Sequence, residues 1–443
     1  MNSILRILLI IVLFINAVGV YARPTTNDSE SLFHYYNSNE VLDYTGIIKK
    51  AGQYHLFYTE RMLDGEKKTI VLKQAVSEDL YHWNEEELNN SPFSVHDTIK
   101  WGIFTDDAKM LGASPEVYLL EIKDDFFQLK VLDEDKWERV DKTFSISSVD
   151  LTTVSLPVLK WSMIIKKWVL TLTDLKSNDV KIYTSQDLEQ WDNTCVIKED
   201  CSRSEMFEKD GKTFFMLSNN IYEVDLTKRG QDCIIARRHL DYGGGYNQTL
   251  VTNINDETVL MGGISVDNYN QDGSSLKLSS PRRMNYREGK FFYAPYLQGL
   301  SKEKGVSRDD KKLIPGLGKN ILSGKFGDAY VLEGNIKYDE VSSYGFLFKV
   351  GSKSSGYELR YYKKQNIYQC TGGEMAVKPV VDYAKVLVVV DNGFIDFYYG
   401  DGSKVMSISV DYTHKASKII LFHQGGELYV KNIKVNPLSF KKK

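Results

Sequence analysis

The sequence predicts an all-β protein in which a β-propeller is followed by a β-sandwich. The 443-residue chain contains 28 Tyr, 20 Phe and 32 Gly but only 9 Pro, a composition that favours short strands joined by turns. Strand patterns recur along the chain, and two of them end on the same S-x-D-L-x-x-W motif, which is typical of repeated blades. A charged and Gly-rich stretch then separates two strand-rich regions, which indicates a domain boundary.

Two copies of one pattern carry the propeller prediction. Each copy is a strand, a turn, a second strand and a closing motif that ends in Trp. The first copy covers 54–58, 70–76 and 77–83, and the second covers 168–172, 180–183 and 185–191. Radial blades have this organisation, so we expect a propeller over 30–300. A generic all-β sandwich is the alternative.

The stretch 301–327 is charged, then Gly-rich, and poor in aromatic residues, so we expect a linker there. Strand patterns resume after it with strict alternation, as in 330–336. The continuous apolar run 386–390 is typical of a strand buried on both faces. The spacing of the turns predicts a β-sandwich over 328–440.

Residues 1–22 have the pattern of a secretory signal peptide. Arg6 precedes an apolar run over 7–20, and small residues lead to Ala22. The run is shorter than the roughly 20 residues that a membrane span requires. We therefore expect cleavage and a secreted, extracellular protein with no membrane contact beyond the signal peptide.

Export would place the four cysteines in an oxidising compartment. Cys195 and Cys201 are close enough in sequence to form a disulfide across one loop, and free thiols are the alternative. Asn27, Asn89 and Asn247 begin N-x-S/T sequons and are candidate glycosylation sites.

Charge and motif content exclude several classes of function. Lys plus Arg total 56 and Asp plus Glu total 59, which gives a net charge of −3 and disfavours a nucleic-acid binder. The seven His form no H-E-x-x-H motif, and Cys and His are not clustered, so we expect no metal and no other cofactor. The Gly run 243–245 lacks the Lys-Ser/Thr of a phosphate loop.

A resemblance to a known family rests on several motifs in order. Residues 51–58 (AGQYHLFY) and 75–83 (AVSEDLYHW) resemble D-G-x-Y-H-L-F-Y and A-x-S-x-D-L-x-H-W of glycoside hydrolase family 32, the invertases, inulinases and levanases. Residues 278–282 (LSSPR) resemble its L-S-x-P-R-E strand, and 390–397 (VDNGFIDF) resemble its V-D-x-S-x-x-E-x-F motif. The resemblance implies a five-bladed propeller followed by a β-sandwich.

The family cleaves β-fructofuranosides with two carboxyl groups about 5–5.5 Å apart, a nucleophile and an acid/base. Asp43 falls on the Asp of the family's N-D-P-N-G box, which makes it the nucleophile candidate; a turn residue is the alternative. Tyr44 follows it at a position that shapes the fructose pocket in the family. Asp106 and Asp107 fall on the F-S-G-S box and are further candidates for sugar contacts, or else solvate a loop.

The other chemical boxes are eroded. The R-D-P box, whose carboxylate holds two sugar hydroxyls, aligns with Ser155-Leu156-Pro157, and Leu cannot accept those hydrogen bonds. The E-C-P-D-L-F box places Ser202 at the acid/base and Arg203 at the Cys. Glu205 is the candidate substitute acid, and a shifted alignment also offers Glu199 or Asp200; a solvated loop charge is the alternative for each.

Three functions follow from this pattern. The first is a secreted family relative that has lost hydrolysis, or retains very little, and binds a carbohydrate or a protein partner. The second is an active retaining β-fructofuranosidase with a substituted acid/base that hydrolyses sucrose or fructans. The third is a structural or effector protein that uses only the propeller surface.

Overall fold

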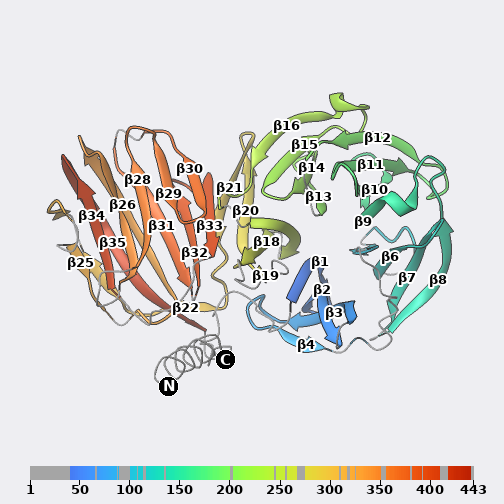
Figure 1. The fold of residues 1–443 in the computed structure, drawn as a ribbon, viewed down its shortest axis with the longest axis horizontal. Coiled ribbons are helices and arrows are strands. Elements are labelled where there is room, and N and C mark those ends of the chain that lie inside the picture. The colour runs from blue at the N-terminus through green and yellow to red at the C-terminus, as the bar shows by residue number, and fades with distance from the viewer. Residues whose placement is uncertain are drawn as a thin grey trace, which may run out of the picture.

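The computed structural model confirms the all-β class, with a propeller beside a sandwich (Figure 1). It describes residues 40–440 except 65–66, 87, 89–99, 107, 113–115, 134–135, 200–202, 244–245, 255–256, 267–274, 309–310, 317–319, 325, 351–355, 380–381, 392 and 410–417. The only helices in these ranges are two 3-10 turns, η1 (Leu151–Thr153) and η2 (Gln231–Cys233). No helix of the described chain is long and apolar enough to cross a membrane. The predicted signal peptide lies outside the described residues.

Five antiparallel sheets follow one another along the chain as blades of the propeller (Figure 1). The first contains β1 (Glu40–Lys50), β2 (Gln53–Asp64), β3 (Lys67–Ser77) and β4 (Asn84–Glu86). The second contains β5 (Trp101–Thr105), β6 (Val117–Ile122), β7 (Phe127–Asp133) and β8 (Lys136–Phe144). The third contains β9 (Val154–Ser162), β10 (Lys167–Asp174), β11 (Val180–Ser185) and β12 (Asp192–Ile197).

The last two blades complete the ring. The fourth contains β13 (Ser204–Lys209), β14 (Lys212–Leu217), β15 (Asn220–Val224) and β16 (Ile234–His239). The fifth contains β17 (Tyr246–Ile254), β18 (Glu257–Val266), β19 (Ser275–Leu278), β20 (Arg282–Arg287) and β21 (Lys290–Pro295). The first strand of each blade contacts the first strand of the next, and β17 contacts β1. These five inner strands therefore surround the propeller axis.

The repeated S-x-D-L-x-x-W motif forms the same hydrogen-bonded turn in both copies. Ser77 Oγ accepts from the Leu80 N–H at 2.9 Å, and Trp83 Nε1 donates to the Leu80 carbonyl at 3.0 Å. Asp79 Oδ1 accepts from the backbone N–H groups of Tyr81 and His82. The second copy repeats every one of these bonds with Ser185, Asp187, Leu188 and Trp191. The motif is thus a structural turn in which side chains satisfy backbone groups.

The C-terminal sandwich contains two sheets packed face to face (Figure 1). One contains β22 (Leu300–Lys302), β23 (Val306–Arg308), β24 (Lys311–Lys312), β26 (Tyr330–Asp339), β31 (Ala384–Asp391), β32 (Phe394–Tyr399), β33 (Lys404–Ser409) and β35 (Glu427–Phe440). The other contains β25 (Asn320–Leu322), β27 (Ser343–Val350), β28 (Tyr357–Tyr362), β29 (Ile367–Cys370), β30 (Gly373–Ala376) and β34 (Lys418–Gln424).

The expected linker 301–327 is part of the sandwich. Its short strands β22, β23 and β24 pair with β35, and β25 pairs with β34. These strands supply backbone partners to long strands that would otherwise present unpaired sheet edges. Their low content of aromatic residues, which suggested a linker, reflects positions at sheet edges.

A buried ion network joins the propeller to the sandwich. Arg282 of β20 is fully buried and donates to Asp241 at 2.6 Å and to Asp396 of β32 at 3.2 Å. Ser407 of β33 donates its backbone N–H to Asp241 at 2.8 Å and its hydroxyl to Asp396. Each buried charge therefore has an opposite charge and further hydrogen bonds, which offset its desolvation.

The two domains also meet at very short backbone distance. A Cβ added to Gly243, in the segment between β16 and β17, would lie 1.6 Å from the Ser407 carbonyl oxygen. Only glycine permits this approach. It lets the neighbouring Tyr242 donate its N–H to the Val405 carbonyl at 2.9 Å.

A disulfide joins Cys195 of β12 to Cys233 of η2. The predicted pairing of Cys195 with Cys201 is therefore wrong, because one sulfur forms one disulfide. The fold decides the partner: a backbone bridge pairs Cys195 with Gly230, which brings the segment that contains Cys233 against β12. Cys201 lies outside the described residues, and burial raises the pKa of the free Cys370 thiol to about 12.

Removal of Arg282 should uncouple the two domains. The Arg282→Ala variant leaves two buried carboxylates without their cation, so we expect a loss of about 3–5 kcal/mol in the free energy of unfolding. All six Trp lie in the propeller, so tryptophan fluorescence follows that domain, while far-UV circular dichroism follows both. The two urea transitions should separate in this variant.

The matched control is Arg283→Ala. Arg283 pairs with Glu257 at 3.0 Å, but both side chains are about two-fifths exposed, and such pairs contribute up to ~1 kcal/mol. Coincident transitions at wild-type stability in Arg282→Ala would contradict the role of the network.

Reduction of the disulfide should destabilise the propeller where the third and fourth blades meet. The bond closes a loop with a sequence separation of 38 residues, for which chain entropy predicts a contribution of up to about 4 kcal/mol. Dithiothreitol should lower the urea midpoint of the wild type by a corresponding amount. A Cys233→Ser variant should already have the lower midpoint and show no further change with dithiothreitol; an equal response of both proteins would disprove the assignment.

Candidate functional site

Asp43 lies on the innermost strand of the first blade. Two register irregularities interrupt the pairing of β1 with β2, one on each side of the Asp43–Tyr44 pair of residues. Such bulges re-aim the side chains of a strand. Asp43 is 1% exposed, so the structure places the predicted nucleophile inside the propeller rather than on an open turn.

Arg203 neutralises Asp43. It directly precedes β13, the inner strand of the fourth blade, and its Nε and Nη2 atoms donate to Asp43 Oδ2 at 3.0 and 2.8 Å. Nη2 also lies 3.3 Å from the Trp101 carbonyl oxygen of β5. Both charged side chains are 2% exposed. One arginine thus links the inner strands of three different blades.

A glycine makes room for this contact. A Cβ on Gly102 of β5 would lie 1.8 Å from the carbonyl oxygen of Pro157 in β9 and 3.5 Å from Arg203 Nη1. Gly102 therefore allows the second and third blades to approach each other beside the guanidinium. The approach is one reason why the ion pair has little access to solvent.

The pairing changes the chemistry that Asp43 can perform. A retaining glycosidase requires a carboxylate that can reach the anomeric carbon of its substrate. Here Asp43 Oδ2 accepts two hydrogen bonds from a cation, and the residue is 1% exposed. Asp43 Oδ1 is also buried and has no hydrogen-bond partner among the described residues. The arrangement favours a structural ion pair over a nucleophile.

Leu156 occupies the position predicted for the hydroxyl clamp. It lies in β9, where the pairing with β10 is interrupted by a bulge, and its φ is 51°. A left-handed conformation is costly for leucine, above all before proline. The side chain of Leu156 is half-buried and has no atom that can accept a hydrogen bond from a sugar.

Glu205, the predicted substitute acid, is also near the axis. It lies in β13, two residues after Arg203, and Lys160 Nζ of β9 is 3.5 Å from its carboxylate. Burial raises the pKa of Glu205, and the positive charges of Lys160 and Arg203 oppose that rise. A raised pKa suits a general acid, which must hold its proton. The positive charges of Lys160 and Arg203 favour the ionised form of the Glu205 carboxyl group and so oppose this role.

The remaining predicted site residues have structural surroundings. Tyr44 is 1% exposed and donates its hydroxyl to the Leu276 carbonyl at 3.3 Å, so it belongs to the core. Asp106 is 1% exposed and accepts the Leu111 N–H, which closes a turn after β5. Glu199 accepts from Asn220 and Arg237 at the outer strands of the fourth blade.

Several predicted residues cannot be placed. Asp107, Asp200, Ser202, Asn27 and Asn89 lie outside the described residues. Asn247 lies in β17 at a register irregularity, and its side chain is not described. In the described part of the chain, no group of three or more His, Cys, Asp or Glu side chains is arranged to hold a metal ion.

Arg203 is the residue that sequence reasoning missed. The resemblance places it at the Cys position of an eroded box, which predicts no role of its own. A usable signal was present: a positive charge next to the lost acid/base position, in a chain that retains the nucleophile position, predicts that the two opposite charges pair. The two residues are 160 positions apart in the sequence, so only the arrangement of the blades in a ring brings them into contact.

Comparisons with known proteins agree with this fold. The levanase of Bacillus subtilis (strain 168) is 22% identical over 496 residues, which cover 93% of this chain and 70% of the levanase. Exo-inulinase from Aspergillus awamori has a TM-score of 0.73 at 14% identity and covers 93% of this chain and 98% of its own. Fructan 1-exohydrolase IIa from Cichorium intybus has a TM-score of 0.72 at 12% identity, with coverage of 93% and 98%.

The family itself follows from a longer match. The model of the glycosyl hydrolases family 32 N-terminal domain matches residues 37–305, which is more than half of the chain and spans all five blades. The resemblance inferred from the motifs is thereby confirmed. The chain belongs to glycosyl hydrolase family 32.

Proposed function

We propose that this protein is a secreted family 32 member that has lost β-fructosidase activity and acts by binding a carbohydrate or a protein partner. One observation carries the proposal: the Asp43 carboxylate, at the family's nucleophile position, is buried in an ion pair with Arg203. Binding without hydrolysis requires the folded propeller and sandwich but not the catalytic carboxyl groups. The scaffold is intact in all five blades and in both sheets of the sandwich.

Two further losses support the same function. Leu156 replaces the carboxylate that would hold two sugar hydroxyls, so those hydroxyls would be buried without partners. The acid/base position falls on Ser202, and loss of a general acid alone typically reduces the rate by about 10²–10⁴-fold. With the nucleophile paired as well, three separate requirements of the retaining reaction fail.

Secretion is supported by two independent features. The first 22 residues have the pattern of a signal peptide. The Cys195–Cys233 disulfide is of a kind that persists in oxidising compartments. Both features suit an extracellular binding protein.

An active fructosidase with Glu205 as the acid is the second candidate. The raised pKa of Glu205 and its position beside Arg203 favour it. This mechanism would require Arg203 to leave Asp43 when substrate binds. The two candidates predict opposite results in one assay.

We expect no hydrolysis of fructosides. Purified protein incubated with sucrose, inulin or levan should release no more fructose, measured by chromatography, than an Asp43→Asn variant prepared in the same way. The variant controls for contaminating hydrolases of the expression host. Turnover near the ordinary enzyme median of about 10 s⁻¹ that disappears in Asp43→Asn would refute the loss of activity, and its further loss in Glu205→Gln would establish the second candidate.

We also expect Asp43 and Arg203 to stabilise the fold as a pair. Arg203→Ala leaves a buried carboxylate without its cation and should cost about 3–5 kcal/mol of unfolding free energy in urea. The double variant Asp43→Asn/Arg203→Gln carries no charge and retains hydrogen-bonding groups, so it should be more stable than Arg203→Ala. If Arg203→Ala is as stable as the wild type, the ion pair is not structural.

A further inference from the structure

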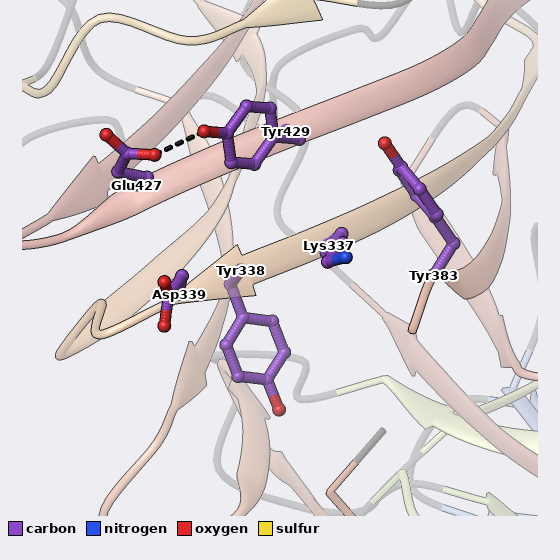
Figure 2. A pocket seen from close by; sticks show the side chains of 6 residues that line it. All are labelled: Lys337, Tyr338, Asp339, Tyr383, Glu427 and Tyr429. Carbon is purple, nitrogen blue, oxygen red and sulfur yellow. Dashed lines mark hydrogen bonds between the residues drawn. The ribbon is translucent and has the colours of Figure 1, made fainter. Parts of the chain in front are cut away.

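A second candidate binding site lies on the sandwich, far along the chain from Asp43. It is a groove with a volume of about 510 Å³, within the range of ordinary ligand sites. Figure 2 shows the six side chains that line it. They come from β26, from β35 and from the residue before β31: Lys337, Tyr338, Asp339, Tyr383, Glu427 and Tyr429.

The strand register explains how these side chains meet. Tyr429 of β35 lies opposite Lys337 of β26, and Glu427 lies opposite Asp339. The pairing of β26 with β31 places Tyr383 beside Lys337 on the other side. Two tyrosines therefore flank one lysine across three strands, roughly 10 Å apart at two strand spacings, and Figure 2 shows this row.

The lining residues other than Tyr338 lie on the face that points away from the sandwich core, whereas Tyr338 packs against that core and its hydroxyl hydrogen-bonds with that of Tyr361. Successive side chains of a strand point to opposite faces, and the alternate residues Ile336, Leu428 and Val430 belong to the core between the two sheets. Farther along the same outer face, Val331 and Val389 pack against the propeller core. The outer face is thus apolar where the propeller covers it and polar, with two tyrosine rings, at the groove.

The charges of the groove nearly balance. Lys312 of β24 pairs with Glu427, and Glu427 also accepts the Tyr429 hydroxyl. Lys337 and Lys431 lie 6.0 and 5.8 Å from the centre of the Tyr383 ring. Three ammonium groups and the two carboxylates of Asp339 and Glu427 therefore surround the groove, which does not favour a strongly charged ligand.

The functional groups match the surface of a sugar chain. Tyrosine rings offer flat apolar faces with a polar tip, and the half-exposed Tyr383 and Tyr429 present such rings at the groove. Carboxylates accept hydrogen bonds and ammonium groups donate them, whereas sugar hydroxyls do both. Lys312 lies 5.9 Å from the centre of the Tyr429 ring. This distance and the two to Tyr383 are at the outer limit of cation–π contacts, so the three ammonium groups are weak competitors for the ring faces.

We propose that this groove binds a neutral oligosaccharide chain, with the rings of Tyr383 and Tyr429 against sugar faces and Asp339 and Glu427 as acceptors for sugar hydroxyls. The inference rests on the proposed function, since it names a site through which a non-hydrolysing family member binds carbohydrate. It does not use the propeller axis.

The test is affinity electrophoresis of the full-length protein in native gels that contain one polysaccharide each. The neutral probes are inulin, levan, dextran and galactomannan, and the charged probes are heparin and polygalacturonate. We expect at least one neutral probe to retard the wild type. The Tyr383→Ala/Tyr429→Ala variant should bind that probe about tenfold more weakly, because it loses both rings.

Two further variants make the result specific. Tyr383→Phe/Tyr429→Phe keeps the rings and should retain most of the retardation. Tyr362→Ala removes a half-buried tyrosine from β28 in the other sheet and should bind as the wild type does. The proposed binding site is refuted if no neutral probe retards the wild type or if only charged probes do so. It is also refuted if Tyr383→Ala/Tyr429→Ala is retarded as strongly as the wild type. Fructose release would refute the proposed function but leave this electrophoretic result unaffected.

Discussion

A carboxylate at the axis of a closely packed propeller has to be neutralised, and the Asp43–Arg203 pair meets that constraint. The inner strands of five blades converge there and leave Asp43 1% exposed. An unpaired buried carboxylate would be protonated or would destabilise the fold. Arg203, the cation that satisfies this requirement, donates two hydrogen bonds to Asp43 Oδ2, so the interaction that stabilises the axis is also the one on which the proposed loss of hydrolysis rests.

The motifs that reveal the family serve the fold and not the chemistry. The S-x-D-L-x-x-W copies satisfy backbone groups in the turns between β3 and β4 and between β11 and β12, and the L-S-x-P-R motif supplies Arg282 to the network with Asp396. These interactions persist whatever occupies the acid/base or clamp position. A chain can therefore retain the propeller and the sandwich while Leu156 and Ser202, the residues predicted at the clamp and acid/base positions, differ from those that the reaction would require.

The sandwich offers a second surface for recognition, separate from the propeller axis where Arg203 pairs with Asp43. Its eight-stranded sheet uses one outer face in two ways, as an apolar contact with the propeller and as a polar groove beyond that contact. The buried Arg282 network holds the two domains in a fixed relation. Recognition through the groove would then present the whole propeller, with its exposed rim, in one orientation to the surroundings.

The sequence by itself determined the all-β class and the order of propeller and sandwich, because alternation, turn motifs and repeat spacing are local properties of the chain. The resemblance to the family singled out Asp43. The same resemblance predicted that Leu156 replaces the hydroxyl clamp. The sequence also indicated a linker where short edge strands lie, and it assigned the wrong partner to Cys195. Only the tertiary structure decided these pairings and the contact of Asp43 with Arg203, since each joins segments brought together by sheet formation or by closure of the ring, which no local pattern records.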